Sequence, residues 1–112
     1  MSRAVYLHDA IQAAEALAID NDIQFLTPPD GAFTAGESYY RAVIESLGRP
    51  LDAIIDCADD GAAAVEALNA GWRHVVLRGP TTPAVAAIAA GLGATLYRRA
   101  PRAIELPDPS RL

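Results

Sequence analysis

The residues of this sequence that could carry out chemistry stand at the ends of short apolar runs. His8 and Asp9 follow the run AVYL, while Asp56, Cys57 and Asp59 close and follow the run AII. A histidine near carboxylates can shuttle protons, and a thiol activated by a histidine can act as a nucleophile. The candidate catalytic residues are therefore His8, Asp56, Cys57 and Asp59, with a carboxylate as base or orienting group.

A simpler interpretation competes with a catalytic site. Asp9 and Asp60 each stand where a helix is expected to begin, and capping that helix is a sufficient reason for an aspartate there. Polar residues also follow strands because loops are solvated. A lone cysteine such as Cys57 is commonly a small buried hydrophobe. The sequence does not decide between the two interpretations.

A second polar group precedes an alanine-rich segment. Arg78, Gly79, Thr81 and Thr82 lead into Pro83, and a threonine followed by proline is typical of a helix start. Backbone N–H groups at a helix N-terminus, together with an arginine, can bind a phosphate or a carboxylate. These residues form the candidate binding site for a small anionic ligand.

Other kinds of site lack their signatures. The chain has no lysine, which excludes Schiff-base chemistry and a P-loop phosphate site. No glycine-rich turn follows the first apolar run, as a dinucleotide site would need. His8, Cys57 and His74 show no paired spacing of metal ligands, so we expect neither a metal nor a cofactor.

Apolar runs and helical periods alternate along the chain. Strands are predicted at residues 4–8, 23–27, 53–57, 74–77 and 95–97, with a short edge strand at 103–106. Helices are predicted after the N-cap residues Asp9, Thr34, Asp60 and Thr82. Thr34 and Glu37 have the spacing of a capping box, and Asn21 fits a left-handed position after the first helix.

Strands that are joined through helices must be parallel, with right-handed crossovers. We predict a three-layer α/β/α domain with a five-stranded, mainly parallel sheet in flavodoxin-like or Rossmann-like order. The alternative is a half (β/α)-barrel, which would leave one sheet face in need of a partner. In the favoured order the first and third strands are neighbours, so His8, Asp56 and Cys57 would converge at the carboxyl ends.

The composition limits the function classes. The chain has 112 residues, of which 52% are hydrophobic, and a net charge of −5. We expect one domain over residues 1–100 and a proline-rich tail over 101–112. The acidic balance argues against nucleic acid and anionic membranes as partners. One cysteine, no long apolar run and no signal-peptide pattern indicate a cytoplasmic protein.

The order of elements resembles that of response-regulator receiver domains, which are five-stranded α/β units of similar size. Asp56 matches the position of their phosphoacceptor, and His8 and Asp9 stand where they carry an acidic pair. Arg78 and Arg98 replace the hydroxyl residue and the lysine of that family. The resemblance therefore implies a related architecture and not the phosphorylation chemistry.

The sequence favours a small non-catalytic module that acts as a homo-oligomer or binds another protein. Tyr39 and Tyr40 point about 100° apart on a helix, and both are candidate interface residues because tyrosine is enriched in contacts. Arg98, Arg99 and Arg102 form a basic cluster that is expected to be solvated surface.

Overall fold

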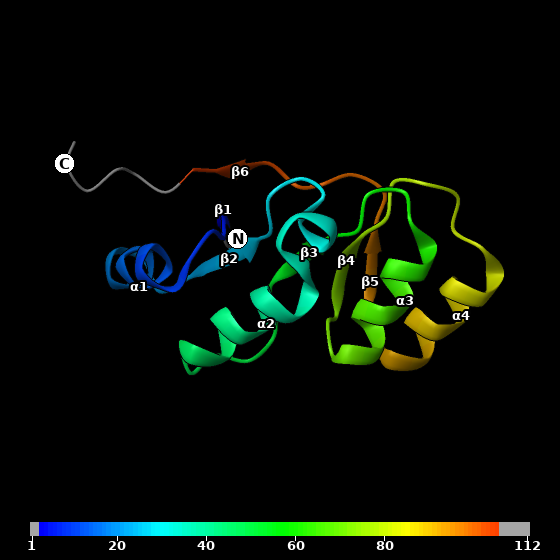
Figure 1. Ribbon diagram of the computed structural model, residues 1–112, viewed down its shortest axis with the longest axis horizontal. Coiled ribbons are helices and arrows are strands. Elements are labelled where there is room, and N and C mark those ends of the chain that lie inside the picture. Colours follow the sequence, from blue (N-terminus) through cyan, green and yellow to red (C-terminus); the bar gives the residue numbers. More distant parts are fainter. Residues whose placement is uncertain (1–2, 106–112) are drawn as a thin grey trace.

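The computed structural model describes residues 3–105, apart from the Thr34 side chain, and shows a parallel sheet with four α-helices (Figure 1). The elements are β1 (Arg3–Tyr6), α1 (Ala10–Ile19), β2 (Ile23–Leu26), a π-helical turn η1 (Ala32–Gly36), α2 (Glu37–Ser46), β3 (Ile54–Asp56), α3 (Gly61–Ala70), β4 (His74–Val76), α4 (Pro83–Leu92), β5 (Thr95–Tyr97) and β6 (Ala103–Ile104). The predicted α/β class is confirmed, and β6 is the edge strand expected near residue 103. Residues 106–112, the rest of the predicted tail, lie outside the described residues.

The strand order differs from the flavodoxin-like order that we favoured. The six strands follow the order β5-β4-β3-β2-β1-β6, so each of the first four strands lies beside the next one along the chain. Every right-handed crossover then steps in the same direction, and this places all the connecting helices on one face of the sheet. The arrangement has the winding of the half-barrel alternative, with an open sheet and a single helix layer.

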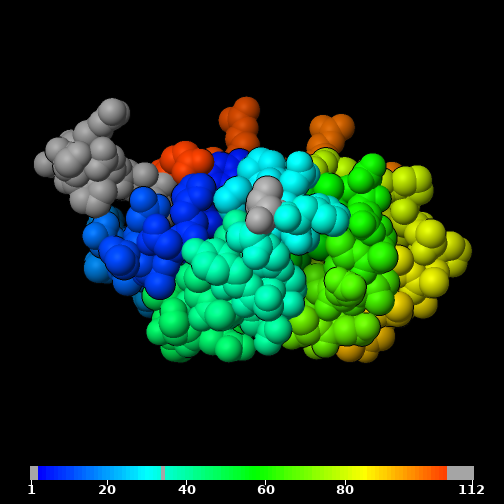
Figure 2. Space-filling model, in the orientation of Figure 1, coloured from blue at the N-terminus to red at the C-terminus, as the bar shows by residue number. Residues whose placement is uncertain are grey.

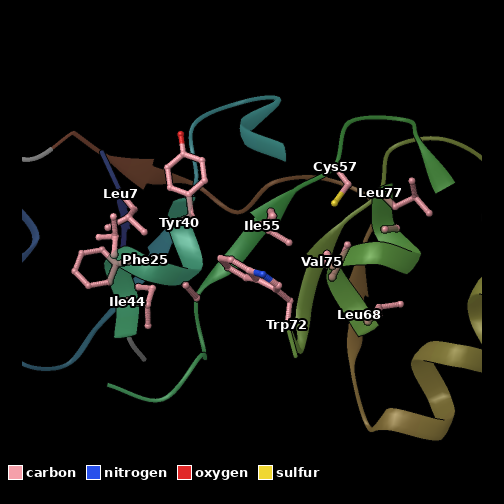
Figure 3. Packing of buried hydrophobic residues seen from close by; sticks show 14 of the residues in the cluster. Leu7, Phe25, Tyr40, Ile44, Ile55, Cys57, Leu68, Trp72, Val75 and Leu77 are labelled. Carbon is pink, nitrogen blue, oxygen red and sulfur yellow. The ribbon is translucent and has the colours of Figure 1, made fainter. Parts of the chain in front are cut away.

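The main core lies between the helix layer and the sheet (Figure 3). Strand residues such as Phe25, Ile55 and Val75 face this layer, and small alanines of α1, α3 and α4 let the helices approach closely. Trp72 is fully buried within it. Its indole N–H donates to Oε1 of Glu37 over 3.0 Å, which ties the start of α2 to the turn before β4.

The second face of the sheet carries a smaller core of Leu26, Ile54 and Val76. No helix residue contributes to it, yet each of the three side chains is at most 1% exposed. Tyr6, Tyr97 and Ala103 pack against the cluster. The chain between β5 and β6 returns across the whole sheet in the opposite direction, so a right-handed crossover places it on this second face.

We call residues 98–102, which link β5 to β6, the strap. From Tyr97 to Ala103 the chain has six peptide steps, which span at most about 22 Å. Five strand spacings separate β5 from β6, and they measure about 24 Å along a flat sheet. The sheet must therefore curve, and the strap, which bends at Arg98 and Arg99, runs from the end of β5 to β6 (Figure 1).

The helix caps follow the sequence in most places. Asp9, Asp60 and Thr82 accept hydrogen bonds from the backbone N–H groups of their first turns, as predicted. The capping box at Thr34 is wrong, because α2 begins only at Glu37, behind η1 and Gly36 with φ of 93°. The left-handed position expected at Asn21 is also wrong, since α1 ends at Asp20 in extended backbone.

Candidate functional site

An arginine-centred cluster occupies the carboxyl edge of the sheet, where the loops after β2, β3 and β4 meet. Nη1 of Arg78 donates to both carboxylate oxygens of Asp56, over 3.0 and 2.7 Å. Nη2 of the same arginine donates to Asp30 over 2.6 Å. One guanidinium thus joins three loops that are far apart in the sequence.

Asp56 is the buried member of this cluster, at 1% exposed. Besides the arginine, its carboxylate accepts the backbone N–H of Ala58 over 2.9 Å. Its own N–H donates to the hydroxyl of Thr27 over 2.9 Å. A buried carboxylate is costly unless it is paired and hydrogen-bonded, and these contacts satisfy Asp56 completely. They also raise the pKa of Arg78, chiefly through its hydrogen bond with Asp56.

The loops around the cluster are tightly fitted. Asp30 and Ala58 adopt left-handed backbone, with φ of 60° and 54°, which costs free energy for residues other than glycine. The backbone N–H of Arg78 donates to the carbonyl of Ala58 over 2.6 Å. Gly79 lies so close to Asp59 that an added Cβ would stand 2.8 Å from its carbonyl oxygen. Close backbone contacts therefore hold the loops after β3 and β4 against each other.

An open pocket of about 610 Å³ lies beside the cluster, lined by Asp30, Phe33, Ala58, Asp59 and Arg78. Its volume falls in the range of small-molecule sites. Arg78 is the one cationic residue in this lining, and it is already shared between two carboxylates. The pocket consequently presents no free positive charge.

The structure does not bring the four candidate catalytic residues together. β2 lies between β1 and β3, so His8 is not beside Asp56 and Cys57 as the favoured order implied. Nε2 of His8 instead contacts Oε2 of Glu105 over 2.7 Å. Asp56 and Cys57 remain neighbours at the end of β3, and Asp59 is the one candidate of the four that lines the pocket.

Cys57 lies on the helix-layer side of the sheet and is fully buried (Figure 3). Burial, together with the charges of the nearby Asp56 and Asp60, raises the pKa of its thiol to about 12. A nucleophilic cysteine needs the opposite, a lowered pKa and access to substrate. The geometry thus agrees with the interpretation of Cys57 as a small core residue.

The anion site expected at Arg78, Gly79, Thr81 and Thr82 stays a prediction. Thr82 caps α4 by accepting the N–H of Val85 over 3.3 Å. An anionic ligand would have to displace the exposed Asp30 from Arg78.

The two tyrosines predicted for an interface lie in different surroundings. Tyr40 is 4% exposed and packs in the main core, so it is not accessible to a partner. Tyr39 is exposed at 41%, and its hydroxyl donates to the carbonyl of His8 over 2.9 Å. This bond fastens α2 to the loop after β1.

An apolar surface that was not predicted from the sequence lies at the end of the molecule formed by α1 and β6. Ile11 and Ile19 of α1 are 75% and 70% exposed, and Ile104 of β6 is 53% exposed. A groove of about 140 Å³ between α1, β1 and β6 is lined by Arg3, Val5, Ala16, Ile19, Asp20, Ile23 and Ile104. We call Ile11, Ala14, Ala18, Ile19 and Ile104 the α1 surface. The available signal was the helix sequence AIQAAEALAI, which is apolar on every side.

Comparisons with known proteins supply no family for the chain. Neither a protein-family model, nor a curated protein, nor a solved structure matches it. Within residues 3–105, no group of three or more histidine, cysteine or acidic side chains could hold a metal ion. In the same part of the chain, no helix is long and apolar enough to cross a membrane.

Proposed function

We propose that this chain is a non-catalytic association module that forms a homodimer through the α1 surface. The observation that carries the proposal is the exposure of Ile11 and Ile19 on one side of a helix. Burying an isoleucine contributes about 1.5–3 kcal/mol, and exposed apolar patches of this kind mark interaction sites. The self-satisfied Arg78–Asp56 cluster and the inert Cys57 thiol offer no competing catalytic set.

A second copy is the partner that fits this surface best. Ala14 and Ala18 are exposed and small, so another α1 can approach closely between Ile11 and Ile19. The only charged residue of α1 is Glu15, which is exposed and lies one turn from both Ile11 and Ile19, and the groove beside Ile104 continues the apolar area. Closed twofold dimers are the commonest homo-oligomers, and an α1–α1 contact closes in this way.

The other end of the molecule provides the competing geometry. α4 lies at the opposite end from α1 (Figure 1), and it exposes Ala84, Ala87 and Leu92 without any charged residue. An α1–α4 contact between copies would be head-to-tail and would build rings or open chains.

Sedimentation equilibrium tests the proposal. We expect the wild-type chain to be a dimer at about 0.1 mM. Ile19→Glu should raise the dissociation constant of the dimer at least about 100-fold, because each dimer loses two buried isoleucines. Ala42→Glu places the same carboxylate on an exposed position of α2 and should leave the dimer intact. A monomeric wild-type chain would contradict the proposal. Dissociation by Ala87→Glu on α4 would instead indicate the head-to-tail contact.

A further inference from the structure

The strap carries three arginines that have no partner within the described residues. Arg98, Arg99 and Arg102 are exposed and make no hydrogen bond or ion pair there. In contrast, Arg41 and Arg78 each donate to a carboxylate. Three guanidinium groups within five residues, none of them paired inside residues 3–105, form a concentrated positive patch on a chain of net charge −5.

The fold holds these arginines in place. Tyr97 in β5 pairs with β4, and Ala103 in β6 pairs with β1, so both ends of the strap are fixed in the sheet. Pro101 fixes its own φ and removes one backbone donor. In the space-filling view, side chains of this segment (orange) stand out beyond the body of the molecule (Figure 2).

β5 beside the strap is an edge strand. It forms one end of the sheet, with β4 as its neighbour, so one side of its backbone has no strand beside it. Arg98 and Arg99 follow it directly. An extended polypeptide can add to such an edge through backbone hydrogen bonds, while side-chain pairs provide specificity.

We propose that the β5 edge, together with Arg98 and Arg99 of the strap, binds a short acidic segment of another protein in extended form. Arginine pairs with carboxylates through two parallel N–H···O bonds. Because Arg98 and Arg99 follow β5 directly, they meet the acidic side chains at one end of a segment that pairs with β5. A nucleic acid fits less well, because a long polyanion would also meet the exposed Asp30 and Asp59 at the same edge of the sheet.

Fluorescence anisotropy with labelled octaglutamate tests this proposal. The double substitution Arg98→Gln and Arg99→Gln should weaken binding about fivefold or more at low salt. The matched control, Arg3→Gln with Arg49→Gln, removes the same charge outside the strap and should bind as the wild type does. Added salt should weaken binding.

Three results would overturn the proposal. Octaglutamate fails to bind, both double variants bind equally weakly, or a thymidine octanucleotide binds more tightly than octaglutamate. The last result would identify a nucleic-acid surface instead. The same titration on Ile19→Glu separates this surface from the proposed dimer, because the strap should bind octaglutamate whether or not the chain dimerises.

Discussion

At the scale of single residues, the ion pairs of Arg78 with Asp56 and Asp30 join the loops at the carboxyl edge of the sheet. Asp56 is buried and depends on Arg78, whereas Asp30 is exposed and contributes a bond that water can replace. Exposed ion pairs stabilise proteins little, but an unpaired buried carboxylate is costly. The two partners of Arg78 should therefore differ in their importance for stability.

Removing the arginine tests this difference. Arg78→Met should lower the free energy of unfolding by about 2–3 kcal/mol, because Asp56 then stays buried without its counterion. Asp30→Asn, at the exposed partner, should cost less than about 1 kcal/mol. Urea denaturation with a constant m-value measures both changes. Equal losses would mean that Asp56 gains nothing particular from the arginine.

The buried thiol makes a second prediction, on pH dependence. The pKa of Cys57 is raised from 9.0 to about 12, so above pH 9 the unfolded chain loses a proton that the folded chain keeps. The contribution of Cys57 to the free energy of unfolding should therefore be constant below that pH and fall between about pH 9 and 12, by up to about 1.4 kcal/mol per pH unit. Urea unfolding across this range measures the slope.

The control for the thiol is Cys57→Ala, which has no group to titrate at this position. Its pH slope should be shallower than that of the wild type by the contribution of one proton. Identical slopes in both proteins would contradict the raised pKa.

At the scale of elements, the loops at the carboxyl edge depend on close backbone contacts. Gly79 leaves no room for a side chain beside Asp59, while Gly91 in α4 has open space around its Cβ position. Neither residue has positive φ, so the two positions differ in packing and not in backbone strain. They form a matched pair for substitution by alanine.

Gly79→Ala should destabilise the fold by about 1–3 kcal/mol, because the methyl group collides with backbone that cannot move aside. Gly91→Ala should stabilise it by about 0.5–1 kcal/mol, because alanine is the better helix former. Melting temperatures of the two variants against the wild type measure both effects. A neutral Gly79→Ala would show that the loop after β3 yields easily.

At the scale of the whole molecule, the strap replaces the second helix layer of a doubly wound fold. On this face Tyr6, Tyr97 and Ala103 pack against Leu26, Ile54 and Val76, and Tyr97 and Ala103 are the residues at the two ends of the strap. Its length is close to the shortest that can reach β6 across the curved sheet. The cover should therefore tolerate a longer strap and fail with a shorter one.

Deletion of Ala100 should detach β6 and expose the second core. We expect a loss of about 2–3 kcal/mol from partial exposure of the three apolar side chains, and binding of the hydrophobic dye ANS. Insertion of one glycine after Ala100 should cost less than about 0.6 kcal/mol, since a longer loop adds little closure entropy. Equal effects of the deletion and the insertion would contradict the inference that the strap is close to the shortest connection that can reach β6.

The sequence by itself determined the local structure. Alternating apolar runs and helical periods identified the strands and helices, and Asp9, Asp60 and Thr82 were predictable caps because capping depends only on neighbouring residues. The start of α2 was not predictable from Thr34 and Glu37. Glu37 bonds to Trp72, 35 residues away, and no local pattern contains that contact.

Only the tertiary structure decided which residues meet. Every crossover could step to either side of the sheet, and the sequence does not encode the direction in any short pattern. The consecutive order separates His8 from Asp56 and brings Asp30 and Asp56 to Arg78. The same order leaves α1 at the end of the helix layer, where Ile11 and Ile19 have no neighbouring helix on their outer side. Residues of one segment, such as Asp56 and Asp59, stay close under any strand order. The grouping of His8 with Asp56 required β1 beside β3, and β2 lies between them.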